Sequence, residues 1–91
     1  MKYKLVYIEW EDAITNNLKW FDEEQAKDWA ENTTMLIYEC GWILKETKRF
    51  IVIANRYSKT SISNGESSLL DVGGLHKIPK TWIRKRVVLK V

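Results

Sequence analysis

The sequence predicts an α+β fold, in which five short antiparallel strands form a strongly bent sheet or a partly open barrel and one helix follows the first strand. Alternating or β-branched apolar stretches recur along the chain, with only one helical pattern among them. Gly41, inside the longest stretch, and Pro79, before the last one, mark bends of the kind that a small barrel needs. The 91 residues, 45% of them hydrophobic, are expected to form a single domain, residues 1–91.

The first half of the chain is predicted to contain a strand, a helix and a second strand. Residues 2–10 alternate with a period of two, which indicates a strand, and residues 11–17 follow as a loop. After an extended piece over residues 18–21, Asp22 can cap a helix and Gln25 can complete a capping box. The helix is expected to end near Glu31 or Asn32; because so short a helix is not stable alone, we expect Trp29 to dock on the sheet. Residues 34–46 form the second strand.

The second half reads as three further strands. A turn over residues 46–49 leads to a β-branched strand over residues 50–57. The polar residues 58–68 form a long loop, a kind of segment that is usually mobile or functional in small domains. A short strand over residues 69–72 bends at Gly73 and Gly74 and continues over residues 75–78 to the corner at Pro79. Residues 82–91 close the sheet.

The charges are distributed unevenly along the chain. Residues 1–46 carry a net charge of −5 and residues 47–91 a net charge of +8. Such an asymmetry favours either a dipolar surface that attracts phosphates or acidic partners, or head-to-tail self-association. Together with the surplus of apolar residues, it predicts a homo-oligomer. The chain has no stretch long enough for a membrane span and no apolar leader, so we expect a cytoplasmic protein without membrane partners.

Little in the sequence indicates catalysis, and we expect no enzyme, no cofactor and no metal site. The only cysteine, Cys40, lies in an apolar run and is interpreted as a small buried hydrophobic residue. The only histidine, His76, has no carboxylate or cysteine partner close to it in sequence, which favours a packing or surface role. Residues 9–12 hold three carboxylates that could bind a divalent cation, but a solvated strand edge is the simpler interpretation.

The last strand carries the clearest functional pattern. Alternation places Arg84 and Arg86 on one face, where two guanidinium groups could contact phosphates. Nearby cations and aromatic rings could add charge and a surface on which a base stacks. The candidate ligand-binding residues are Arg84, Arg86, Lys80, Trp82, Lys77 and Tyr57. The alternative is a charged edge strand that prevents aggregation between sheets.

Four short segments resemble a family of small uncharacterised proteins of tailed bacteriophages and prophages. They are residues 6–13 (VYIEWEDA), 40–46 (CGWILKE), 50–54 (FIVIA) and 78–83 (IPKTWI), in an order and spacing similar to that family over nearly the whole chain. The turn at residues 78–83 before the closing strand also resembles the end of an Sm-like barrel, although a strand precedes the helix here. The resemblance implies a phage accessory protein made in the host cytoplasm.

Three functions follow as hypotheses. The first is a non-enzymatic counter-defence protein that binds a nucleotide or another phosphate-bearing ligand through its basic and aromatic surface. The second is an Sm-like RNA-binding module. The third is an inhibitor of a host defence protein, which would be contacted through the acidic face of the helix. The phage setting of the first and third rests on family analogy alone.

Overall fold

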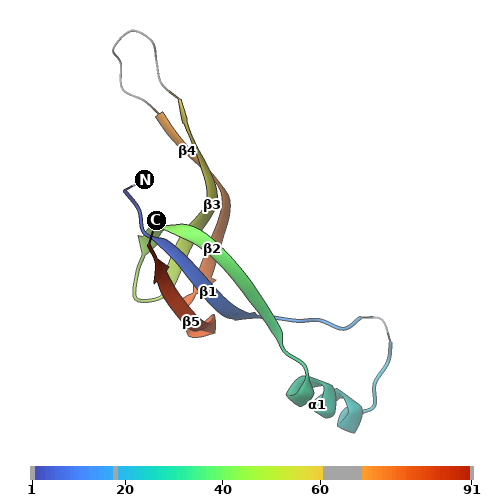
Figure 1. Cartoon of the computed structure of the whole chain (residues 1–91). Coiled ribbons are helices and arrows are strands. Elements are labelled where there is room, and N and C mark those ends of the chain that lie inside the picture. Colours follow the sequence, from blue (N-terminus) through green and yellow to red (C-terminus); the bar gives the residue numbers. More distant parts are fainter. Residues whose placement is uncertain (1, 18, 61–68, 91) are drawn as a thin grey trace.

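The computed structural model describes residues 2–17, 19–60 and 69–90, which form one five-stranded sheet and one projecting helix (Figure 1). The strands are β1 (Leu5–Asp12), β2 (Met35–Glu46), β3 (Phe50–Thr60), β4 (Leu69–Pro79) and β5 (Ile83–Leu89). The helix α1 (Glu23–Asn32) lies between β1 and β2, and the 3₁₀ turn η1 (Lys80–Trp82) joins β4 to β5. The molecule is elongated, measuring 67 × 26 × 22 Å along its principal axes.

The strand order is β4-β3-β2-β1-β5, and every neighbouring pair is antiparallel. The two outer strands, β4 and β5, are not paired with each other in this order, so the sheet is bent but not closed. Figure 1 shows the strongly twisted strands and the helix beyond one end of the sheet. The predicted α+β class, the five strands and the position of the helix after the first strand are confirmed.

The hydrophobic core lies on one side of the bent sheet and consists of aliphatic side chains from three of its strands. Fully or almost fully buried are Val6 and Ile8 of β1, Ile51 and Ile53 of β3, and Ile78 of β4. Trp10, Ile43 and Ile83 pack against them and are partly exposed. The alternation of the first strand is therefore confirmed, because Val6, Ile8 and Trp10 face the core together.

Gly41 allows β2 to approach β3 closely at the edge of this core. A Cβ atom at Gly41 would lie 3.0 Å from the carbonyl oxygen of Ala54 and 3.0 Å from the Cδ1 atom of Ile53. The irregularity that was predicted at Gly41 occurs slightly later, because the β2–β3 register shifts between Ile43 and Lys45. The side chain of Cys40, next to it, is exposed, so its interpretation as a buried residue is wrong. It alternates with the buried Gly41 and faces away from the core.

The helix begins as predicted but does not pack as predicted. The Asp22 carboxylate accepts a hydrogen bond from the Gln25 backbone N–H (2.8 Å), and the Gln25 side chain accepts one from the Asp22 N–H (3.1 Å), forming a capping box. No residue of α1 is buried, and Trp29 contacts Phe21 of the preceding segment instead of the sheet. The reason is geometric: the β1–β2 ladder extends to Asp12 and Met35, beyond the core, and holds the helix away from it (Figure 1).

The second half follows the predicted order with different strand lengths. β3 continues through Thr60, so Ser58 belongs to a ladder with Asp71 and not to a loop. β4 is continuous across its two glycines, and Gly74 absorbs the bend with a φ of +63°. Of the predicted long loop, residues 61–68 lie outside the described residues, as does position 18 of the predicted extended piece. The corner at Pro79 is confirmed, and the last strand begins at Ile83 instead of Trp82.

Candidate functional site

A cleft between the β2–β3 turn and the end of β4 brings two cations together around apolar side chains. Its lining residues are Arg49, Phe50, Lys77 and Pro79, and its volume is about 380 Å³. We call it the basic cleft. Such a volume lies within the range of small-molecule sites, which is roughly 300–1,000 Å³. Of its lining residues, only Lys77 is among the predicted ligand-binding residues.

The sequence around the turn explains why these four residues meet. The Thr47 hydroxyl accepts hydrogen bonds from the backbone N–H groups of Arg49 (3.1 Å) and Phe50 (3.2 Å), which shapes the turn. Phe50 then pairs with Pro79 across the β3–β4 ladder, and the Lys80 N–H donates to the Arg49 carbonyl (2.9 Å). The backbone of both chain segments is therefore fixed on each side of the cleft.

The two cations of the cleft have no anionic partner among the described residues. The Lys77 ammonium lies over the Phe50 ring, 4.4 Å from its centroid, and no carboxylate lies within ion-pair distance of Lys77 or Arg49. A cation–π contact positions an ammonium group without neutralising it. The cleft therefore keeps two positive charges available to an anion.

Two other predicted residues, Lys80 and Arg86, form ion pairs with Glu46. The Arg86 guanidinium donates two hydrogen bonds of 2.8 Å to the Glu46 carboxylate, and the Lys80 ammonium lies 2.6 Å from it. Hydrogen bonds from Arg86, and then from Lys80, lower the pKa of Glu46 to about 2 against opposing desolvation. The same bond raises the pKa of Arg86. This cluster holds β2, η1 and β5 together.

Arg84 and Arg86 do not share a face, which corrects the prediction from alternation. The β1–β5 register shifts between Glu9 and Trp10, so that Arg86 lies opposite Ile8 while Trp10 lies opposite Ile83. The extra residue within this shift is Arg84. Its guanidinium donates to the Thr81 carbonyl (2.7 Å) and lies 3.5 Å from the Glu11 carboxylate.

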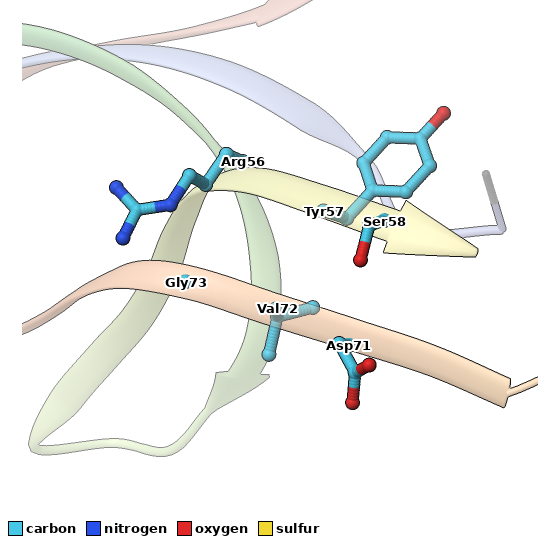
Figure 2. A pocket seen from close by; sticks show the side chains of 6 residues that line it. All are labelled: Arg56, Tyr57, Ser58, Asp71, Val72 and Gly73. Carbon is cyan, nitrogen blue, oxygen red and sulfur yellow. The ribbon is translucent and has the colours of Figure 1, made fainter. Parts of the chain in front are cut away.

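Neither of the predicted aromatic residues lies in the basic cleft. Trp82 stacks on Trp10 with a centroid distance of 6.1 Å and an interplanar angle of 19°. Trp82 and Arg84 line one hollow of about 280 Å³ together. Tyr57 contacts the Trp42 ring edge-on at 4.9 Å and lines a different hollow, about 290 Å³ in volume, between β3 and β4 (Figure 2). The six predicted ligand-binding residues are therefore distributed over four separate places, and only Lys77 lies in the basic cleft.

A carboxylate–imidazole pair that the sequence did not indicate, Glu39 with His76, lies on the core side of the sheet. The Glu39 side chain, only 10% exposed, accepts a 2.7 Å hydrogen bond from Trp10 Nε1 and lies 2.7 Å from His76 Nδ1. His76 also lies edge-on to Trp10, with ring centroids 6.5 Å apart. His76 thus has a carboxylate partner, contrary to the expectation from its sequence neighbours, because the ladders bring residues 39 and 76 together. The pair positions the imidazole and links β2 to β4.

Neither a metal centre nor a membrane-spanning helix emerges from the described part of the chain. Within residues 2–17, 19–60 and 69–90, no three His, Cys, Asp or Glu side chains gather as metal ligands would. Glu9, one of the three carboxylates at residues 9–12, instead accepts a 2.6 Å hydrogen bond from the Tyr7 hydroxyl. This bond is the main reason why the pKa of Tyr7 rises to about 12. No helix in those ranges is long and apolar enough to cross a bilayer.

Comparisons with protein-family models, with curated proteins and with solved structures found no match to this chain.

Proposed function

We propose that this protein is a non-enzymatic binding protein that takes a small phosphate-bearing ligand of the nucleotide type into the basic cleft. The observation that supports the proposal is the pair of cations, Arg49 and Lys77, that face one cleft and lack carboxylate partners among the described residues. Lys80, Arg84 and Arg86, by contrast, are each close to a carboxylate. The binding free energy of an anion is most favourable at cations that do not first have to be separated from a carboxylate.

The chemistry of the cleft suits such a ligand. A guanidinium can donate two parallel hydrogen bonds to one phosphate, and an ammonium supplies a compact second charge. Phe50 and Pro79 form the apolar part of the lining, against which a base or sugar would be shielded from water. A phosphate alone would use the cations, whereas a nucleotide would use both parts of the cleft.

The biological setting of the proposal comes from the sequence resemblance. A relative of small phage proteins that binds a nucleotide would act in the host cytoplasm, where it would sequester a nucleotide signal of the host's defence. We therefore infer a counter-defence accessory protein. This setting rests on analogy, and the ligand-binding proposal can be tested without it.

A thermal-shift screen tests the proposal. The purified protein is heated with linear nucleotides, cyclic nucleotides and a short single-stranded RNA. A ligand that binds only the folded state raises the melting temperature. We expect a rise with one nucleotide that is lost in Arg49→Ala and Lys77→Ala. Lys85→Ala is the matched control, because it removes the same charge as Lys77→Ala from an exposed position on β5 outside the cleft.

Two results would contradict the proposal in different ways. A shift with RNA alone, weakening steeply as salt is added, would indicate an RNA-binding module. No shift with any probe would exclude nucleotide binding and favour a host protein as the partner. A nucleotide shift that persists in both cleft variants would place the site elsewhere.

A further inference from the structure

We propose that copies of this protein associate head to tail, with the helical arm of one copy docking on the hairpin arm of the next. The helical arm is residues 19–35, and the hairpin arm is residues 55–60 and 69–75. The two arms project from opposite ends of the molecule, so they cannot meet within one chain (Figure 1). This association is independent of the basic cleft, since neither arm contains a residue that lines it.

The helical arm exposes large apolar side chains and lacks support from its own chain. Trp20 is 98% exposed and Met35 is 46% exposed, while no residue of α1 is buried. A hollow of about 350 Å³ lies between the segment before the helix and α1, and Phe21 and Trp29 contribute its apolar lining. Isolated helices shorter than about 12 residues are marginal in water, so a contact with a second copy would stabilise α1 beyond what its capping box and the Phe21–Trp29 contact supply.

The hairpin arm presents an apolar surface of its own. Leu70 is 43% exposed and Val72 36%, and they share one face of β4 at an edge of the sheet. Tyr57, which is 41% exposed and pairs with Val72 across the ladder, extends this face onto β3. Figure 2 shows the hollow in this arm, where Arg56 points away from Asp71 and Tyr57 lies on the neighbouring strand β3. Aliphatic side chains of this size could contact the rings of Phe21 and Trp29 in the hollow of the helical arm, whose other lining residues are polar.

The charges of the two arms are complementary. The helical arm has five acidic residues and two lysines: Asp22, Glu23, Glu24, Asp28 and Glu31, with Lys19 and Lys27. The hairpin arm as defined has two cations, Arg56 and Lys59, and one acidic residue, Asp71. Only Lys27 and Glu23 form an ion pair among the charged residues of the two arms (3.0 Å). The excess of acidic residues on the helical arm and of cations on the hairpin arm makes a second copy of this chain the partner that suits both surfaces. An interface between two different arms is heterologous.

The association predicts a specific behaviour of variants. Trp20→Ser with Trp29→Ser removes the apolar contacts of the helical arm, and Leu70→Ser with Val72→Ser removes those of the hairpin arm. Each double variant alone lacks one half of every interface and is expected to remain monomeric. Mixed, they retain one intact arm each and are expected to form a one-to-one dimer that grows no further. Val88→Ser is the control, since Val88 is exposed on β5 and belongs to neither arm.

The measurement is sedimentation equilibrium over a concentration series, with circular dichroism to verify that each variant keeps its sheet. We expect the wild-type mass and the Val88→Ser mass to rise above the 10.8 kDa of one chain as concentration increases. A wild-type protein that stays monomeric throughout would overturn the proposal. Double variants that still associate when each is alone would also overturn it, and so would a mixture of the two that forms no dimer, as expected if each arm binds its own counterpart or a foreign protein.

Discussion

The Glu46 carboxylate accepts two 2.8 Å hydrogen bonds from the Arg86 guanidinium and thereby joins the end of β2 to β5, strands that are not neighbours in the sheet. Lys80 of η1 contacts the same carboxylate. The ion pairs of these three side chains connect an inner strand to an edge strand. Because the Arg86 guanidinium is hydrogen-bonded to Glu46, it is not free to bind the ligand that the sequence pattern predicts for it.

Glu46→Gln should weaken the fold in a pH-dependent way. The folded-state pKa of Glu46 is about 2 and its ordinary value is 4.5, so the contribution is fully present above pH 4.5 and is lost as the pH falls toward 2. Because the groups are about one-third exposed, solvent screening limits the effect to about 1 kcal/mol or less at neutral pH. Urea unfolding at neutral and acidic pH measures it. An equal loss at both would contradict the assignment.

Glycine should be required at position 41 and dispensable at position 73. A Cβ atom at Gly41 would lie 3.0 Å from a backbone oxygen of β3, whereas at Gly73 it would meet the flexible Arg56 side chain. We expect Gly41→Ala to cost roughly 1–3 kcal/mol of unfolding free energy, as overpacked sites do. Gly73→Ala serves as the control and should cost much less. Chemical denaturation compares the two, and equal costs would argue against the close approach of β2 and β3.

Glu39→Ala should destabilise the protein by leaving Trp10 Nε1 without its acceptor. Loss of a partner for a part-buried donor costs about 1–3 kcal/mol. His76→Ala should cost less, because the imidazole is about half exposed and Glu39 retains its bond to Trp10. Urea unfolding of both variants ranks the two contacts. A larger loss in His76→Ala would mean that the imidazole, and not the indole, is the main partner of the carboxylate.

Trp29→Ala should leave the unfolding of the sheet nearly unchanged. Trp29 packs on Phe21 and lies outside the core, whereas Ile53 is fully buried. Ile53→Ala is expected to cost about 2–5 kcal/mol. Comparing the two denaturation midpoints tests whether the helix contributes to the stability of the sheet. A comparable loss in Trp29→Ala would show that the helix docks on the sheet after all.

The features predicted correctly from sequence are those determined by nearby residues. The capping box needs only Asp22 and Gln25, and the buried face of β1 follows from alternation within one strand. Pro79 likewise marks its corner without reference to the rest of the chain. Such features are set by backbone chemistry and periodicity, which a single sequence contains.

The features that could not be predicted depend on how strands pair. The bulge that separates Arg84 from Arg86 and the meeting of Glu39 with His76 both depend on register, which a strand's own residues do not specify. The shortness of the helix predicts that Trp29 docks on the sheet, but the β1–β2 ladder extends beyond the core and holds the helix away from it. The sequence predicts only a turn at Arg49. Its position in the same cleft as Lys77 follows from the pairing of β3 with β4.

The most direct test of the proposed function is a backbone amide NMR titration of the wild-type protein with adenosine monophosphate, with adenosine and ribose 5-phosphate as partial ligands. The account predicts that the largest shifts occur at Arg49, Phe50 and Lys77, and that the nucleotide binds more tightly than either of its parts. Shifts centred on residues 84–86, or no saturable shift with any of the three compounds, would contradict it.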